Sequence, residues 1–212
     1  MQENQVALKQ KLQQGLVQLE LFTEARFQAL WQYLLLLQKW NQVYNLTAIE
    51  TLDAMISQHL LDSLVLAEHV RGQGHEFLDV GTGAGLPGIP LSIIFPEQHW
   101  TLLDSNGKKT GFLLAVKARL GLPNVEVVRQ RVEVYQPDKL YHGILSRAFT
   151  TLEEFICNTR HLLQPSGAWY ALKGPQVSLE LASISAYAPK VIALQVPGLS
   201  AQRFLVKINN KN

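Results

Sequence analysis

Residues 77–88 have the sequence FLDVGTGAGLPG, and residues 89–95 continue it with the apolar segment IPLSIIF. The first four residues predict a short buried strand. The glycines that follow let the backbone turn sharply and approach a ligand closely. The apolar segment predicts a helix whose first N–H groups face the loop. A strand, a glycine loop and a helix in this order indicate a ligand site at the carboxyl end of a parallel sheet.

Short apolar runs separated by helix-like segments follow this stretch, a pattern typical of a parallel sheet with crossover helices. The strands predicted in this way are 77–80, 100–104, 125–129, 143–146, 169–173, 191–196 and 204–208. Pro197, Gly198 and a few polar residues separate the last two, too little chain for a helical crossover. We therefore predict an α/β fold with a seven-stranded, mostly parallel sheet and an antiparallel last strand.

The chain before residue 75 has helical periodicity instead. Thr23 is a plausible N-cap for an amphipathic helix with apolar residues at spacings of three and four from 27 to 37. A second helix is expected from 52 to 70, and the segment 71–74, RGQG, ends it. The predicted organisation is an N-terminal helical extension over 1–74, packed on a core domain over 75–212.

Composition limits the class of protein. The chain has 212 residues, of which 47% are hydrophobic and 17% charged, so it can form one substantial core and is not disordered. Its net charge is +2, yet six Lys or Arg and one acid lie between Lys108 and Arg131. This segment is either a positive surface that attracts polyanions or an ordinary solvated helix face.

Single residue types exclude other classes. Cys157 is the only cysteine, so it forms no internal disulfide and no Cys-based zinc site, and it favours a reducing cytoplasm. The six histidines include no H-x-x-x-H pair, so we expect no metal. The longest uncharged stretch near the N-terminus, 27–38, is too short for a membrane span, and no signal peptide is expected before it.

The glycine loop after the first predicted strand and an acid after the second together favour a nucleoside-type ligand. Asp104 ends the strand after the glycine loop, where a carboxylate can accept hydrogen bonds from both hydroxyls of a ribose. The dinucleotide fingerprint requires glycine at position 86, and this chain has Leu86, which weakens a pyrophosphate site. The alternative is a tight turn followed by an aspartate that caps a helix.

The loop and this acid resemble the pattern of class I S-adenosylmethionine-dependent methyltransferases, which have a Rossmann-like fold. Further segments are similar to one family within that class, the bacterial 16S rRNA guanine-N7 methyltransferases (GidB, or RsmG). These segments are KWN at 39–41, YNLT at 44–47, HLLDS at 59–63, DVGTGAGLPGIPL at 79–91, LDS at 103–105, SRAF at 146–149 and YALKG at 170–174. The similarity covers nearly the whole chain.

The resemblance implies a cofactor, a reaction and a partner. S-adenosylmethionine would donate its methyl group to N7 of a guanine at position 527 of 16S rRNA, either naked or within the small ribosomal subunit. N7 carries an unprotonated lone pair, so the transfer needs no general base and depends on alignment of the reacting atoms. Our default for the oligomeric state is a monomer, with no membrane partner.

The resemblance also assigns site residues. The residues carried over as cofactor-binding are Asp79, Gly81, Gly83, Leu86, Asp104, Val132, Glu133 and Arg147. Positive charge around the cofactor, independently of the resemblance, predicts that RNA binds to Lys108, Lys109, Arg131 and Lys173. Arg147 is the one candidate for a catalytic role: it could bind an RNA phosphate or the cofactor carboxylate, or it could close a salt bridge with a nearby acid.

Two further groups have structural interpretations. His59, Asp62 and Ser63 lie on one helix face, but groups on a single turn cannot form the relay of a hydrolase, so we expect them to pin the N-terminal helices to the sheet. Trp31 has the helical spacing of a core residue, whereas Tyr44 could equally stack on a base.

Other functions remain open from sequence. A methyltransferase of small molecules would use the same fold, and a ribosome-assembly factor could bind the cofactor without using it. A nicotinamide oxidoreductase is disfavoured by Leu86.

Overall fold

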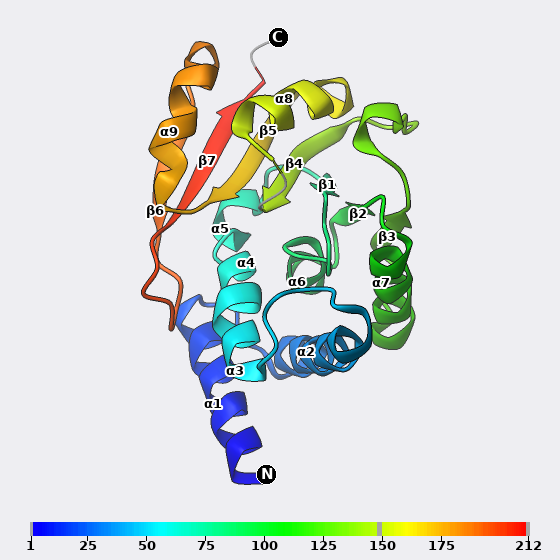
Figure 1. Cartoon of the computed structure of the whole chain (residues 1–212), viewed down its shortest axis with the longest axis vertical. Helices are drawn as coiled ribbons and strands as arrows, with labels where there is room; N and C mark the ends of the chain where they lie inside the picture. The colour runs from blue at the N-terminus through cyan, green and yellow to red at the C-terminus, as the bar shows by residue number, and fades with distance from the viewer. Residues whose placement is uncertain (1, 148–149, 211–212) are drawn as a thin grey trace.

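A seven-stranded sheet with the order β3-β2-β1-β4-β5-β7-β6 forms the centre of the computed structural model, which describes residues 2–147 and 150–210 (Figure 1). Its strands are β1 Glu76–Val80, β2 His99–Leu103, β3 Val125–Val128, β4 Tyr141–Arg147, β5 Leu163–Lys173, β6 Lys190–Leu194 and β7 Arg203–Asn209. The first five pair in parallel, and β7 is antiparallel to both β5 and β6. The predicted α/β fold is confirmed. Ala148 and Phe149, part of the segment SRAF, lie outside the described residues.

One strand is longer than expected. β5 begins at Leu163, six residues before the predicted start, and includes the segment QPSG at 164–167. Its pairing with β4 shifts register between Tyr141 and Gly143. Pro and Gly are tolerated in a strand at such an irregularity, which is why this segment resembles a loop in the sequence.

The N-terminal helices are α1 Gln2–Gln18, α2 Glu24–Tyr44, α3 Leu52–Met55, α4 Asp62–Leu64 and α5 Ala67–Val70. Thr23 caps α2 as predicted, because its hydroxyl accepts from the Arg26 N–H at 3.2 Å. The helix expected over 52–70 is interrupted by a π-helical turn, η1 Ile56–Leu61. Among the described residues, no helix has the length and apolarity to cross a bilayer.

Two buried clusters cover the two faces of the sheet. One contains Phe77, Trp100 and Leu145 together with apolar side chains of the N-terminal helices, α6 Gly88–Ile94 and α7 Gly107–Leu120. The other joins alternate strand residues such as Leu78 and Ile144 to α8 Leu152–Thr159 and the segment around α9 Ser178–Leu181.

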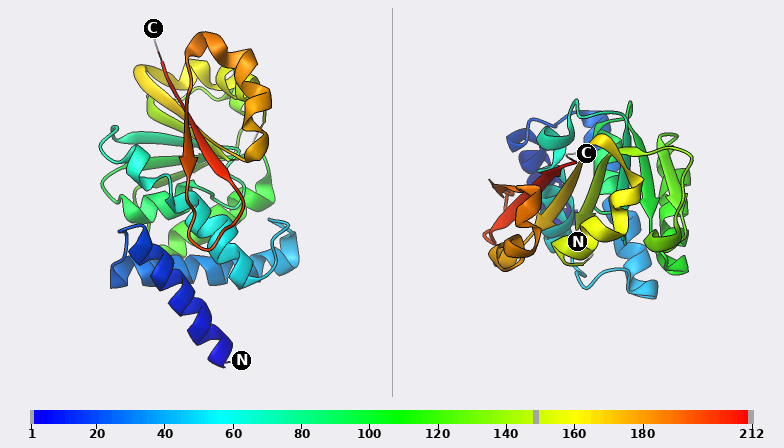
Figure 2. Two further views of the ribbon diagram at one scale, coloured as in Figure 1. Left: turned by 90° about the vertical axis from the view of Figure 1, so that its left-hand side faces the viewer. Right: turned by 90° about the horizontal axis from the view of Figure 1, so that it is seen from above.

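Figures 1 and 2 place α1 and α2 at one end of the molecule and α8 and α9 at the other. Trp31 is buried, as predicted, while Tyr44 is exposed. Apolar side chains of the N-terminal helices belong to the same buried cluster as Phe77 and Trp100, so these helices share one core with the sheet.

Candidate functional site

The glycine loop folds over the carboxyl ends of β1 and β2. Gly81, Gly83 and Gly85 have φ angles of 63°, 60° and 88°. These angles lie in the left-handed region that glycine adopts without strain. The N–H groups of Gly81 and Thr82 donate to the carbonyl of Leu103 at 2.9 and 3.2 Å, which ties the loop to the neighbouring strand.

Asp79 clamps the loop from beneath. Its Oδ2 accepts from the Thr82 hydroxyl at 2.6 Å and from the Gly88 N–H at 2.8 Å. Burial raises the pKa of this carboxyl to about 7, although the two hydrogen bonds act in the opposite direction. A Cβ on Gly88 would lie 2.2 Å from Leu102 Cδ2, so the close approach of α6 to the sheet requires glycine there.

Asp104 joins the loop to the start of α7. Its Oδ2 accepts from the Gly83 N–H at 3.0 Å and lies 3.9 Å from the Lys109 ammonium. Its Oδ1 accepts from the Asn106 N–H at 2.8 Å. The N-cap of α7 is Asn106, whose side chain accepts from the N–H groups of Lys108 and Lys109. The alternative of a capping role for Asp104 is therefore wrong.

A cavity of about 300 Å³ opens beside these groups. Its lining residues are Val80, Gly81, Leu103, Asp104, Ser105, Lys109, Gln130, Arg131, Val132 and Glu133. Three of these residues, Val80, Leu103 and Val132, are apolar, and six are polar or charged, so the cavity offers one apolar wall and many hydrogen-bonding groups to a ligand. The cavity brings together cofactor residues and RNA-binding residues that were predicted separately. Four lining residues were missed, although each is adjacent in sequence to a predicted residue: Val80, Leu103, Ser105 and Gln130.

Other predicted residues lie outside the cavity lining. Leu86 is buried in the core, and Asp79 is buried below the loop. Lys108 is exposed on the first turn of α7. Lys173 is held at the end of β5 by Glu180, with 2.9 Å between its ammonium and the carboxylate, and by the carbonyl of Thr150. Cofactor binding and RNA binding by all the predicted residues, inside and outside the cavity lining, stay predictions.

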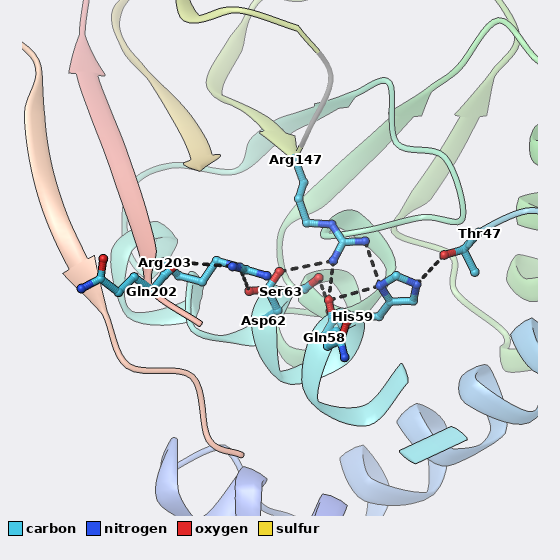
Figure 3. Close-up of polar contacts among 8 residues, drawn as sticks. All are labelled: Thr47, Gln58, His59, Asp62, Ser63, Arg147, Gln202 and Arg203. Carbon is cyan, nitrogen blue, oxygen red and sulfur yellow. Dashed lines mark hydrogen bonds and ion pairs between the residues drawn. The ribbon is translucent and has the colours of Figure 1, made fainter. Parts of the chain in front are cut away.

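Arg147 extends from the end of β4 towards η1 instead of into the cavity (Figure 3). Its Nη1 donates to the carbonyl of Gln58 at 2.9 Å and to Asp62 Oδ2 at 3.3 Å, and its Nη2 donates to His59 Nδ1 at 3.2 Å. The other oxygen of Asp62 accepts from Arg203 Nε at 2.8 Å. The salt bridge that we gave as one alternative for Arg147 is present.

These contacts also decide the role of His59, Asp62 and Ser63. The Ser63 hydroxyl donates to the carbonyl of His59, and His59 Nε2 contacts the Thr47 hydroxyl at 2.7 Å, so the three side chains form no hydrolase relay. Asp62 binds arginines of β4 and β7. The prediction that this face pins the N-terminal helices to the sheet is confirmed for His59 and Asp62, whereas Ser63 bonds only within its own helix.

A family model described as "GidB: rRNA small subunit methyltransferase G" matches residues 26–206. The chain belongs to this family. It is 52% identical to the ribosomal RNA small subunit methyltransferase G of Hydrogenovibrio crunogenus, over 83% of this chain and 82% of the relative. It is 50% identical to the protein of the same name from Chromobacterium violaceum, over 93% of this chain and 96% of the relative.

Solved structures show the fold class. A SAM-dependent methyltransferase from Aquifex aeolicus aligns with a TM-score of 0.54 and 18% identity, covering 74% of this chain and 93% of that one. The N-methyltransferase NodS from Bradyrhizobium japonicum, in complex with S-adenosyl-L-homocysteine, aligns with a TM-score of 0.55 and 16% identity. The alignment covers 72% of this chain and 86% of that one. The predicted class I methyltransferase fold is confirmed.

A contact from the N-terminal extension to the glycine loop was not foreseen. Tyr33 in α2 is fully buried, and its hydroxyl donates to the carbonyl of Ala84 at 2.8 Å. Burial raises the pKa of this phenol, so the group stays protonated and remains a donor. In this GidB-family chain, the loop is thus held from the extension as well as from the sheet.

We expect Tyr33→Phe to weaken binding of S-adenosylhomocysteine several-fold, because the loop loses a hydrogen bond at its centre. Leaving the Ala84 carbonyl unpaired costs about 1–3 kcal/mol of folding free energy. Calorimetric titration and urea unfolding measure the two effects. The matched control is Tyr44→Phe, at an exposed tyrosine of the same helix; if Tyr33→Phe bound as tightly as this control, the contact would have no part in shaping the loop.

Proposed function

We propose that this chain transfers the methyl group of S-adenosylmethionine to N7 of a guanine in the RNA of the small ribosomal subunit. The observation that carries the proposal is the cavity between the glycine loop and Asp104, in a chain of the GidB family. The position of the guanine follows from the resemblance. We also propose that the protein acts in the cytoplasm as a monomer, and that residues 1–74 form an extension that supports the site.

The cavity has suitable groups for a nucleoside. The Asp104 carboxylate would accept hydrogen bonds from the ribose hydroxyls, in place of a contact that it now makes within the loop. Val80, Leu103 and Val132 offer apolar contacts for a base. When bound, the cofactor supplies an electrophilic methyl group on a sulfonium.

The reaction needs little more from the protein than alignment. Guanine N7 attacks through its lone pair and no proton leaves, so no side chain has to act as a base. Holding two reactants in line can lower a barrier by about 7–11 kcal/mol. Positive charge moves from sulfur to the base in the transition state, and a carboxylate such as Glu133 at the cavity stabilises a cation.

Basic residues near the cavity would bind RNA phosphates. Lys109 and Arg131 line the cavity, and Lys108 is exposed beside them on α7. Lys173 contributes less to a positive surface because Glu180 neutralises it. Phosphate contacts release counterions, so the affinity should fall steeply with salt.

The test is transfer of labelled methyl from S-adenosylmethionine to 16S rRNA, free and within the small subunit, at two salt concentrations. We expect N7-methylguanine in at least one RNA form. Lys108→Ala should lower the slope of log affinity against log salt by about 1. Lys139→Ala is the control, because Lys139 is an exposed lysine that pairs with Glu76 at the start of β1.

Other outcomes would identify the alternatives. Binding of S-adenosylhomocysteine without transfer to either RNA form would favour a ribosome-assembly factor. Salt-insensitive transfer to a small molecule, with no RNA binding, would favour a small-molecule methyltransferase.

A further inference from the structure

The contacts of Arg147 leave one edge of its guanidinium open. The group has five N–H donors. Two on Nη1 and one on Nη2 bind Gln58, Asp62 and His59. Within residues 2–147 and 150–210, the donors on Nε and the second Nη2 hydrogen have no acceptor. Two parallel donors on one edge fit a pair of oxygens on a carboxylate or phosphate.

The groups that hold the opposite edge all come from the N-terminal extension. Gln58 and His59 belong to the π-helical turn η1, and Asp62 follows it directly. Such turns are rare and occur frequently at functional sites. Figure 3 shows the three residues converging on the guanidinium from one side. The side chain of Arg147 is thus fixed at both ends, by β4 and by η1.

Asp62 is itself held in place. It is 2% exposed, and each of its oxygens binds a different arginine, Arg147 at 3.3 Å and Arg203 at 2.8 Å. Burial alone raises the pKa of this carboxyl, whereas both guanidiniums oppose that shift. A carboxylate fixed by Arg203 can orient Arg147 without moving.

The charges around Arg147 leave a net attraction for anions. Burial and the neighbouring guanidinium lower the pKa of His59 to about 4, so the imidazole is neutral at neutral pH. Its Nδ1 lies 3.2 Å from both the Gln58 carbonyl oxygen and Arg147 Nη2, and it accepts from Arg147 in the tautomer that carries its proton on Nε2. Two arginines then face one carboxylate, which leaves one positive charge uncompensated among these groups.

We propose that Asp62 and His59 are positioning residues for methyl transfer, which orient Arg147 so that its open edge binds a pair of anionic oxygens during the reaction. This inference rests on the proposed function. The oxygens belong to an RNA phosphate or to the carboxylate of the cofactor. The extension is then part of the catalytic apparatus, although it lies outside the cofactor cavity.

A double-mutant cycle separates positioning from a purely structural clamp. Asp62→Asn keeps the shape of the side chain and removes its charge. We expect kcat to fall about tenfold or more, since a displacement of a positioning group by 1 Å can cost up to about 10²-fold. In the Arg147→Gln background the same change should lower kcat no further, because Asp62 acts through Arg147.

The matched control is Asp53→Asn, the same substitution at an exposed carboxylate that pairs with Lys11. Wild-type kcat and KM in Asp62→Asn would overturn the inference, and so would effects of Asp62→Asn and Arg147→Gln that multiply. An inactive wild-type protein would instead refute the proposed function. Calorimetry with S-adenosylhomocysteine identifies the anion. If Arg147 binds the cofactor carboxylate, the Kd for S-adenosylhomocysteine rises in Asp62→Asn. If Arg147 binds an RNA phosphate, that Kd is unchanged and the KM for RNA rises.

Two substitutions at His59 provide a second test if Asp62→Asn folds poorly. Asn places an oxygen near the position of Nδ1, which accepts from Arg147, whereas Gln places a nitrogen near that of Nε2, which contacts Thr47. We expect His59→Asn to retain several-fold more activity than His59→Gln at equal melting temperature. Equal activity of the two variants would exclude positioning by Nδ1.

Discussion

Asp104→Ala is expected to weaken binding of S-adenosylhomocysteine at least a hundredfold. Two hydrogen bonds from ribose hydroxyls to a carboxylate are worth about 1.5–3 kcal/mol each, and 1.4 kcal/mol corresponds to a factor of ten. The carboxylate also accepts from the N–H groups of Gly83 and Asn106, so its removal loosens the loop before any ligand arrives. Isothermal titration calorimetry measures the loss directly.

Two further variants make this result interpretable. Asp104→Asn keeps an acceptor and removes the charge, so its affinity should lie between those of Asp104→Ala and the wild type. Ser105→Ala alters the neighbouring residue of the same cavity without touching the carboxylate, and it should bind within a few-fold of wild type. Wild-type affinity in Asp104→Ala would place the cofactor elsewhere.

Asp79→Asn should raise the free energy of unfolding of the ligand-free protein, relative to the wild type, by more at pH 8 than at pH 5. The pKa of Asp79 is raised from 3.8 to about 7 by burial, so between these values the folded state binds a proton that the unfolded state has lost. The free energy of unfolding of the wild type therefore falls as the pH rises through this window. From pH 5 to pH 7 the loss at this site is about 2 kcal/mol. An asparagine at position 79 does not titrate, so the variant does not lose this stability as the pH rises.

Urea unfolding of both proteins at pH 5 and pH 8 tests this expectation. The difference between variant and wild type should grow by about 3 kcal/mol over this range. Asp138→Asn, at an exposed carboxyl, controls for the change in net charge. A difference that stays constant with pH would mean that Asp79 remains ionised in the folded protein.

Local patterns determined most of the fold. The glycine loop, the apolar runs and the Thr23 cap are contained in short stretches of sequence, and each strand was placed to within a few residues except β5. The prediction for 164–167 was wrong because Pro and Gly usually end a strand, whereas here pairing across an irregularity keeps them in the sheet. Ile56, Leu60 and Leu64 are spaced by four residues, as in an α-helix, so periodicity did not detect the π-helical turn.

The site was predictable to the extent that its residues follow strands. Asp104 was predicted in this way, whereas Glu133, five residues after β3, came only from the family resemblance; both line the cavity. The sequence predicted an acidic partner for Arg147 but not which acid, because Asp62 lies 85 positions earlier in the chain. The contact between Tyr33 and Ala84 spans 51 positions and has no local signal. Such contacts are decided by how the helices pack on the sheet.

The shared core has a practical consequence for anyone who wishes to work with a smaller fragment. Apolar side chains of α1 and α2, including Leu16 and Leu34, belong to the same buried cluster as Trp100 and Leu205 of the sheet. A truncated chain starting at residue 75 would expose that face to water and invite aggregation. The N-terminal helices are part of the folding unit of the sheet, so we expect that they cannot be exchanged for those of another protein without loss of stability.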